Sequence, residues 1–269
     1  MKLYWSFRGR FMKPTFFSLI VCCMLLVFFS GCGSDHQQIK TKKRVDVQSE
    51  ELQFQTPAEG APIAIFSTPY GEFRAVLYPE LAPMAVENFT TLANQGYFNG
   101  LPFHRVIEDF IIQSGDGTGS GNGGTTCWDG VPFPVELSNR LHHYSGALAM
   151  AHLGQDTTAN FSQFYIVQTS SDSISQQDAD TLKQKGMKES VANTYHAAGG
   201  APYLDHKNTI FGQVYQGMEV VDKIAIASAS NQNGTPSTKV EITSVTISKY
   251  GQQEPASSQE SAESTSDSQ

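Results

Sequence analysis

A single arginine lies among aromatic and branched apolar residues in segment 103–116, which ends in a Gly-Asp turn. Arg105 stands between Phe103 and Phe110, and Gln113 follows eight positions after the arginine. The segment holds neither a nucleophile beside a general base nor a cluster with the spacing of metal ligands. A cationic fork beside an apolar wall suits an apolar substrate that carries a carbonyl and needs no bond made or broken. The peptide bond before a proline has these properties.

Rotation about such a bond is chemistry that hydrogen bonds alone can accelerate. Resonance sets the barrier at about 18–20 kcal/mol, and the twisted transition state localises a lone pair on the prolyl nitrogen. Arg105 can donate from its rigid fork to that nitrogen or to the carbonyl, which stabilises the twisted state more than the planar one. Gln113 would hold the substrate carbonyl or orient Arg105. The alternative role for Arg105, a surface ion pair, is disfavoured by its apolar neighbours.

Other chemistries find less support. Adjacent His142 and His143 would face opposite ways on a strand, and no carboxylate or cysteine spacing accompanies the histidines. The glycines at positions 119, 121 and 124 match part of a dinucleotide-binding pattern, yet no helix follows them. We therefore expect no metal and no cofactor. The histidines that raise the question of a metal are His104, His142, His143 and His152.

The first residues have the pattern of an export signal. A positive region precedes an apolar run of about fourteen residues, 16–29, which is short for a membrane span of roughly 20. The following Phe29-Ser30-Gly31-Cys32 resembles the lipobox of bacterial lipoproteins, in which the cysteine is lipidated and becomes the mature N-terminus. An uncleaved signal anchor and a plain secretory signal remain alternatives. The positive residues are Lys2, Arg8, Arg10 and Lys13.

Composition divides the chain into four parts and limits its partners. The net charge of −8 becomes −12 when the four positive charges of residues 1–31 are removed, which argues against nucleic acid. After export, Cys127 remains as a lone thiol, so the domain must hold itself by its core. We expect a signal peptide at 1–31, a lipidated N-terminus and flexible linker at 32–57, a globular domain at 58–249 and a disordered acidic tail at 250–269.

The globular part predicts strands separated by turns, with two core helices far apart in sequence. A Pro/Gly turn joins strands at 63–66 and 73–78, Pro83 begins the first helix, and the arginine segment follows it as a strand. Residues 115–124 are too rich in glycine for anything but a loop. This order favours a mostly antiparallel barrel capped by helices. The remaining predictions are strands at 147–152, 163–168 and 209–214, a helix at 218–227, and a last strand at 240–247 with a bulge near 243–244.

An insertion at 171–202 does not fit the strand rhythm. Two short helices, 178–185 and 189–197, are expected to meet at Gly186. The insertion is either a structural flap without function or a lid that tunes access of a substrate. The apolar residues that could pack against the barrel are Leu182, Met187, Val191 and Tyr195.

Four segments in order resemble the cyclophilins, the family of peptidyl-prolyl cis-trans isomerases. Segment 103–116 resembles the core signature, 147–152 the strand at the pocket floor, 162–166 the Ser-Gln-Phe-Phe-Ile strand, and 203–212 the Trp-Leu-Asp … Val-Phe-Gly segment. The resemblance covers about residues 60–249, and the helical insertion is similar to one in cyclophilins of Gram-positive bacteria. It implies a closed eight-stranded antiparallel barrel with a helix at each end. A barrel of that size is filled by side chains, so the substrate groove should lie outside it.

The resemblance also implies roles for particular residues. Arg105 and Gln113 would be catalytic. Ala151 and His152 would offer backbone contacts to the residue before proline, and Gln163 would touch the substrate backbone. The walls of the proline pocket would be Phe110, Ile111, Tyr165 and Leu204.

Three positions depart from the family pattern at the rim of the same groove. Tyr203 replaces a tryptophan, Asn208 stands where a histidine is usual, and Tyr165 adds a hydroxyl to a phenylalanine. We expect Tyr203 and Asn208 still to contact substrate, with activity reduced and sensitivity to cyclosporin poor.

The sequence thus predicts a peptidyl-prolyl isomerase that assists the folding of exported proteins at the outer face of the cell membrane. Its partners would be proline-containing polypeptides and the membrane, the latter through lipid on Cys32, and the protein would be a monomer. The alternative is an extracellular peptide-binding or chaperone module that keeps the fold with little turnover.

Overall fold

The structure, a computed structural model, describes residues 41, 46–152, 158–228 and 234–252, which belong to one compact unit, 39–269. The predictions for the signal peptide, for lipidation at Cys32 and for most of the acidic tail lie outside these residues. No helix within the described ranges is both long enough and apolar enough to cross a membrane.

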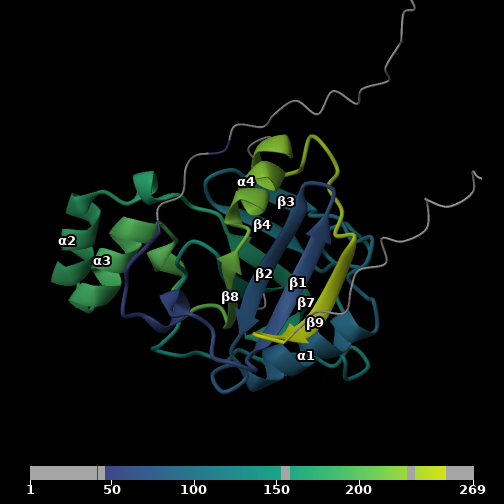
Figure 1. Ribbon diagram of the computed structural model, residues 1–269. Helices are drawn as coiled ribbons and strands as arrows, with labels where there is room; N and C mark the ends of the chain where they lie inside the picture. Colours follow the sequence, from purple (N-terminus) through teal and green to yellow (C-terminus); the bar gives the residue numbers. More distant parts are fainter. Residues whose placement is uncertain (1–40, 42–45, 153–157, 229–233, 253–269) are drawn as a thin grey trace, which may run out of the picture. The chain divides into compact units, whose positions relative to one another are not determined.

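The described chain is built on one antiparallel sheet, ordered β3-β4-β7-β6-β8-β2-β1-β9, with short β5 paired to β7 (Figure 1). This order confirms the mostly β fold of eight main strands. The strands are β1 (Pro62–Thr68), β2 (Gly71–Leu77), β3 (Arg105–Ile107), β4 (Ile111–Ser114), β5 (Phe133–Pro134), β6 (Ala147–His152), β7 (Ala159–Val167), β8 (Ile210–Gln216) and β9 (Ser244–Lys249).

The two end strands, β3 and β9, are joined through the segments that precede them. The Gly100 amide donates to the Ile242 carbonyl at 2.7 Å, and the Phe103 amide donates to the Val240 carbonyl at 2.9 Å. The bulge expected near 243–244 is where the chain changes partner: residues 240–242 pair with the segment before β3, and β9 pairs with β1. In each pairing, apolar side chains must alternate so that they face the core. The two alternations are out of step, so the apolar spacing shifts by one residue where the chain changes partner.

Fully buried aromatic side chains fill the inside of the curved sheet. Phe164 of β7 packs edge to face against Phe89 and Phe98, with ring centroids 5.6 and 5.5 Å apart. Such pairs are worth about 0.5–1.5 kcal/mol each beyond the area that they bury. Because side chains occupy the interior, a polypeptide substrate has to bind on the outer face. The other fully buried phenylalanines of this core include Phe66, Phe73, Phe103, Phe133 and Phe211.

Two helices close the ends of the barrel core, as expected. Helix α1 (Pro83–Asn94) and helix α4 (Met218–Ala227) lie at opposite ends of the strands (Figure 1). Helix α1 begins with Pro83 at its first position, and the Glu136 carboxylate accepts hydrogen bonds from the backbone amides of Met84 and Ala85 at 3.0 and 2.9 Å. This acceptor compensates for the missing side-chain cap at Ala82.

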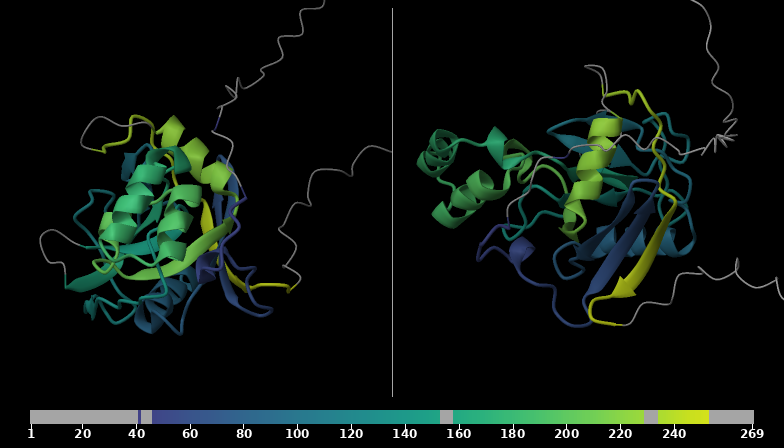
Figure 2. Two further views of the ribbon diagram at one scale, coloured as in Figure 1. Left: turned by 90° about the vertical axis from the view of Figure 1, so that its left-hand side faces the viewer. Right: turned by 45° about the horizontal axis from the view of Figure 1, so that its top comes forward.

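The insertion forms the two expected helices beside the barrel (Figure 2). Helix α2 (Gln176–Gln184) begins with a capping box of Ser175 and Asp178, and helix α3 (Glu189–Ala198) follows a turn at Gly186. The predicted apolar residues form a third cluster: Tyr144, Val191 and Tyr195 are buried in it, and Leu182 and Met187 pack against them. The insertion flanks also hold two short 3-10 helices, η2 (Ser171–Ser173) and η3 (Pro202–Leu204).

The folded part begins earlier than the domain boundary expected at residue 58. The 3-10 helix η1 (Leu52–Phe54) lies within the segment assigned to the linker, and Gln53 is only 4% exposed. The Ser190 hydroxyl of α3 donates to the Glu51 carboxylate at 2.6 Å. Residues 49–57 therefore pack on the domain beside the insertion, a placement that their polar composition does not indicate.

Candidate active site

The arginine segment is a tight hairpin and not the single strand that the sequence suggested. The chain turns at Asp109, whose φ of 58° lies in the left-handed region, so β3 and β4 run antiparallel. Arg105 is thereby directly opposite Gln113, which is opposite Tyr165, which is opposite Ala149. Side chains in register on neighbouring strands share a face. The hairpin thus brings the two predicted catalytic residues into one row on the outer face.

Three polar side chains form a chain along this row. The Arg105 Nη1 donates to the Gln113 Oε1 at 3.4 Å, and the Gln113 Nε2 donates to the Gln163 Oε1 at 2.9 Å. The bond to Gln113 uses one of the five N–H donors of the half-buried guanidinium, so donors remain for a substrate. The structure therefore brings Arg105 and Gln113 together, and their catalytic roles stay predictions.

Gln163 has a supporting place in this arrangement. Its side chain is fully buried, and its Nε2 donates to the carbonyls of Gly121 and Gly123 at 3.0 and 2.7 Å. Its oxygen accepts from Gln113, so both ends of the Gln163 amide are hydrogen-bonded within the protein. Gln163 fixes which way the Gln113 amide points, while its direct contact with a substrate backbone stays a prediction.

The glycine-rich loop at 115–124 is held by one buried carboxylate. Asp116 accepts from the Thr118 amide at 2.7 Å and from the Gly121 amide at 2.6 Å. Burial raises the pKa of Asp116, but the hydrogen bonds from Thr118, Gly123 and Gly121 outweigh it, so the pKa lies well below its ordinary 3.8. The charged carboxylate keeps the loop in the conformation that presents two carbonyls to Gln163.

The apolar residues expected to bind proline gather beside this row. Ile111 and Tyr165 are buried in one outer-face cluster, with Phe110 and Leu204 packed against it. Tyr203, which is 59% exposed, stacks on Phe110 with ring centroids 6.1 Å apart. The structure therefore brings the predicted wall together from the hairpin turn, from β7 and from the segment after the insertion.

The far rim is held to strand β6. The Asn208 Nδ2 donates to the Met150 carbonyl at 3.2 Å, immediately before Ala151 and His152. Where the family pattern has a histidine, Asn208 thus makes a hydrogen bond to strand β6. The backbone of this strand is expected to contact the substrate. The chain after His152, residues 153–157, is outside the described part.

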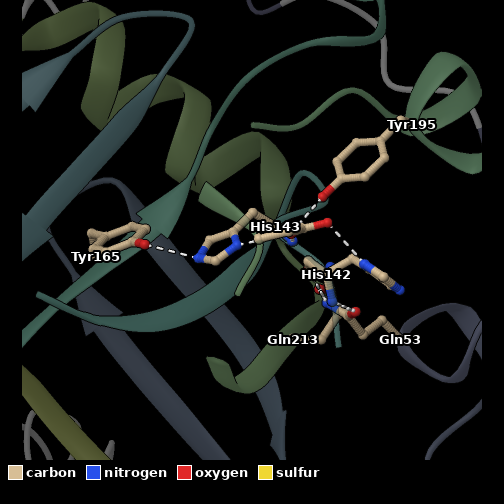
Figure 3. A network of polar contacts seen from close by, with 7 residues as sticks. Gln53, His142, His143, Tyr165, Tyr195 and Gln213 are labelled. Carbon is tan, nitrogen blue, oxygen red and sulfur yellow. Dashed lines mark hydrogen bonds and ion pairs between the residues drawn. The ribbon is translucent and has the colours of Figure 1, made fainter. Parts of the chain in front are cut away.

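The hydroxyl of Tyr165 leads to a buried network that the sequence did not predict (Figure 3). It lies 2.9 Å from the His143 Nε2, and the Nδ1 atoms of His143 and His142 lie 3.0 and 2.8 Å from the two oxygens of Asp205. The expectation that the two histidines face opposite ways was wrong, because residues 141–143 are not in a strand. Among the described residues, no group of three or more His, Cys, Asp or Glu side chains could hold a metal ion.

Asp205 is an ionised carboxylate inside this network. Burial raises its pKa, but hydrogen bonds from His142 and His143 outweigh burial and hold the pKa well below its ordinary 3.8. Burial lowers the pKa of His143 below its ordinary 6.5, although Asp205 opposes that shift. The centre of the network is therefore a carboxylate anion beside a neutral imidazole at neutral pH.

Chemically, the site offers donors beside an apolar wall, and among its described residues no nucleophile is activated by a base. An apolar ring can rest on Phe110, Ile111, Tyr165 and Leu204, while Arg105 donates to the amide that precedes it. Donors held in place before the amide twists cost no reorganisation when it does. This arrangement suits rotation about a prolyl bond.

The comparisons with known proteins agree with that chemistry. Residues 63–247 match the family described as cyclophilin type peptidyl-prolyl cis-trans isomerase. Relatives whose names assign them to these isomerases occur in Staphylococcus saprophyticus, 40% identical over 63% of this chain and 83% of theirs, and in Staphylococcus aureus, 38% identical over 65% and 86%. A crystal structure of a Cryptosporidium parvum cyclophilin type isomerase, solved in the presence of the dipeptide Ala-Pro, superposes with a TM-score of 0.54. It is 26% identical and covers 69% of this chain and 98% of its own.

The chain belongs to the cyclophilin type peptidyl-prolyl cis-trans isomerases. It is accordingly an enzyme that interconverts the cis and trans forms of X-Pro peptide bonds, and its substrates are proline-containing peptides.

Proposed function

We propose that this isomerase acts on exported proteins at the outer face of the cell membrane, to which a lipid on Cys32 tethers it. The observation that carries the proposal is the order of an apolar run, small residues at positions 30 and 31, and then a cysteine. Two acyl chains on that cysteine give stable anchoring where one is marginal. The folded domain would then reach its clients as a monomer at the end of the segment that follows Cys32.

Composition supports this location. The mature chain is acidic, which disfavours both nucleic acid and direct contact with anionic lipid headgroups. Cys127, the lone cysteine outside the signal and the lipobox, is a free thiol in the structure. An exported domain of about 190 residues can bury enough apolar surface to be stable without disulfides.

Replacement of Cys32 by alanine tests the anchor. We expect the protein to leave the membrane fraction and to lose labelling by radioactive palmitate, while isomerase activity per mole stays unchanged. Protease added to intact cells should degrade the wild-type domain if it faces outward. Unchanged membrane retention of Cys32→Ala would indicate an uncleaved apolar anchor, and protection from protease would contradict the outer location.

The alternative from the sequence, a peptide-binding or chaperone module with little turnover, draws on the departures at Tyr203 and Asn208. Family membership and the intact Arg105–Gln113 pair favour the enzyme. An isomerisation assay with a proline peptide, run beside an assay of aggregation suppression, separates the two functions. A module of the second kind would suppress aggregation equally well after Arg105→Ala and would not accelerate isomerisation before it.

A further inference from the structure

We propose that the helical insertion, residues 171–202, braces the proline pocket. In this proposal, Asp205 and His143 are positioning residues that connect Tyr195 of the insertion to Tyr165 of the pocket wall. The inference rests on the isomerase activity of the chain and is independent of where the protein is anchored.

The connection is a continuous path of short hydrogen bonds between α3 and β7. The Tyr195 hydroxyl donates to the Asp205 Oδ1 at 2.8 Å, and the same oxygen accepts from the His143 backbone amide at 2.8 Å. The His143 ring then connects that carboxylate to the Tyr165 hydroxyl. Figure 3 shows His143 between Tyr165 on one side and Tyr195 on the other.

The chemistry of each atom fixes the direction of these bonds. Because an ionised Asp205 can only accept, the His143 Nδ1 carries the proton and donates it. A neutral imidazole with its proton on Nδ1 has a lone pair on Nε2, so the Tyr165 hydroxyl donates to that nitrogen. The Asp205 charge therefore sets the tautomer of His143, and the tautomer sets the orientation of the Tyr165 hydroxyl.

Burial makes this path stiff. The side chains of Asp205 and His143 are 5% and 0% exposed, and Tyr165 and Tyr195 are 5% and 0% exposed. A buried polar atom that loses its partner is left without compensation for its lost hydration, so each member resists leaving the arrangement. Asp205 also follows Tyr203 and Leu204 directly in sequence, so the bonds that hold its carboxylate hold that rim of the groove as well.

A second set of contacts braces the hairpin turn before Phe110 from the start of the insertion. The Ser170 amide donates to the Asp109 Oδ1 at 2.8 Å, and the Ser173 hydroxyl makes a short bond to the other Asp109 oxygen. Asp109 directly precedes Phe110, whose carbonyl accepts from the Gln168 amide at 2.8 Å. Two aromatic residues of the pocket wall are thus connected to the insertion through an aspartate, Phe110 through Asp109 and Tyr165 through Asp205.

Removal of the Tyr195 hydroxyl tests the path far from the substrate. We expect Tyr195→Phe to raise the KM for a proline peptide about two- to tenfold, the range for losing one hydrogen bond, with kcat changed by less than about twofold. The effect should fall on KM because the variant loosens the apolar wall and leaves Arg105 in place. Tyr78→Phe is the matched control, since Tyr78 is buried in the outer-face cluster that contains Tyr165, and its hydroxyl has no hydrogen-bond partner among the described residues.

Two further measurements separate positioning from mere stability. In a double-mutant cycle, Tyr195→Phe and Tyr165→Phe should be non-additive in KM by at least about twofold, because they remove the two ends of one path. Long-range nitrogen-15 spectra should show the Nδ1-protonated tautomer of His143 in the full chain and a mixture of tautomers in Asp205→Asn. If Asp205→Asn fails to fold, the double-mutant cycle of Tyr195→Phe and Tyr165→Phe still tests the proposal.

Unchanged KM in Tyr195→Phe, even with lower thermal stability, would overturn the proposal, because the hydroxyl would then support the fold alone. Additive effects in the cycle, or an unchanged His143 tautomer in folded Asp205→Asn, would overturn it too. A rise in KM for Tyr78→Phe equal to that for Tyr195→Phe would show that loss of any buried tyrosine hydroxyl near the pocket suffices, which also contradicts a specific path.

Discussion

The two sides of the substrate groove are held by different physics. On one side, Arg105, Gln113 and Gln163 form a chain of a guanidinium and two neutral amides, placed by strand register. On the other side, Asp205 is a buried anion that accepts from the side chains of His142 and His143, 63 and 62 residues away, and from the Tyr195 hydroxyl. In the predicted binding mode, the first side places donors next to the bond that rotates, and the second shapes the wall against which the proline rests. The departures from the family pattern, at Tyr165, Tyr203 and Asn208, all fall on the second side.

The largest effect is expected from Arg105→Ala. Loss of one preorganised donor to a developing charge typically costs about 10²–10³ in kcat. Arg105 is half-buried and takes no part in the apolar core, so stability should hardly change. Turnover of a proline peptide by exchange spectroscopy, with thermal unfolding alongside, measures both quantities.

Arg105→Lys is the informative companion variant. Lysine keeps the charge and loses the planar fork, so we expect it to recover only part of the lost rate. Full recovery would mean that charge alone is required, and undiminished activity of Arg105→Ala would remove the distinction between the two sides.

The next effect is on stability, at the junction of the insertion and the barrel. Gly200 has a φ of 140°, and a Cβ there would lie 2.4 Å from the His143 carbonyl oxygen and 2.7 Å from the Tyr195 ring. Crowding of this kind in a packed region costs typically about 1–3 kcal/mol, and the strained φ adds to it. We expect Gly200→Ala to lower the free energy of unfolding by about 2 kcal/mol or more, measured by urea denaturation.

Gly186→Ala provides the contrast for this variant. Gly186 also has a positive φ, of 94°, but nothing lies within 4 Å of its would-be Cβ. Its substitution should therefore report the backbone strain alone and cost less. Equal losses for the two glycines would mean that close approach of the insertion to His143 is not what Gly200 provides.

The sequence predicted the first side of the groove and much of the fold for a clear reason. Strand and helix periodicity is local, and the observed bounds of β6 and α4 are those expected from it. Arg105 and Gln113 are eight residues apart, so the segment itself contained both. The single error there was the turn, because only the left-handed conformation of Asp109 converts one apparent strand into a hairpin.

The buried network that holds the second side could not be predicted in the same way, although its groove residues Tyr165, Tyr203 and Asn208 were. His143 and Asp205 are 62 residues apart, and Gln53 reaches the His142 carbonyl across 89 residues. Adjacent histidines were considered only as metal ligands, and a glutamine in a polar segment gave no sign that it would be buried. The Leu204-Asp205 pair within a recognised motif was the one available signal, but its partners arise only from folding.

Two buried glutamines offer a finer comparison of the sides. Gln163→Ala should lower kcat about tenfold. Gln113 loses the hydrogen bond that orients its amide, and one such bond is worth roughly 1–1.5 kcal/mol. Gln53→Ala removes bonds to the backbone of His142 and to Gln213 on the other side, and should lower stability with kcat preserved. A kcat loss in Gln53→Ala as large as in Gln163→Ala would show that the sides do not differ in this respect.

The smallest effect is a difference in how the two sides respond to pH. His143 has a folded pKa below its ordinary 6.5, so the unfolded chain binds a proton that the folded chain does not. Its contribution to stability is therefore complete above pH 6.5 and is lost as pH falls from there, with a slope of at most about 1.4 kcal/mol per pH unit. Asp205 and Asp116 also have lowered pKa values, but their contributions are present above their ordinary 3.8 and are lost only below it. Burial also lowers the pKa of His104, which lies beside Asp116. Denaturation from pH 7 to 5 should thus show a slope that His143→Gln reduces by the His143 share, while neither aspartate titrates in that range. A slope that is undiminished in His143→Gln would place the titrating group outside the insertion side of the groove.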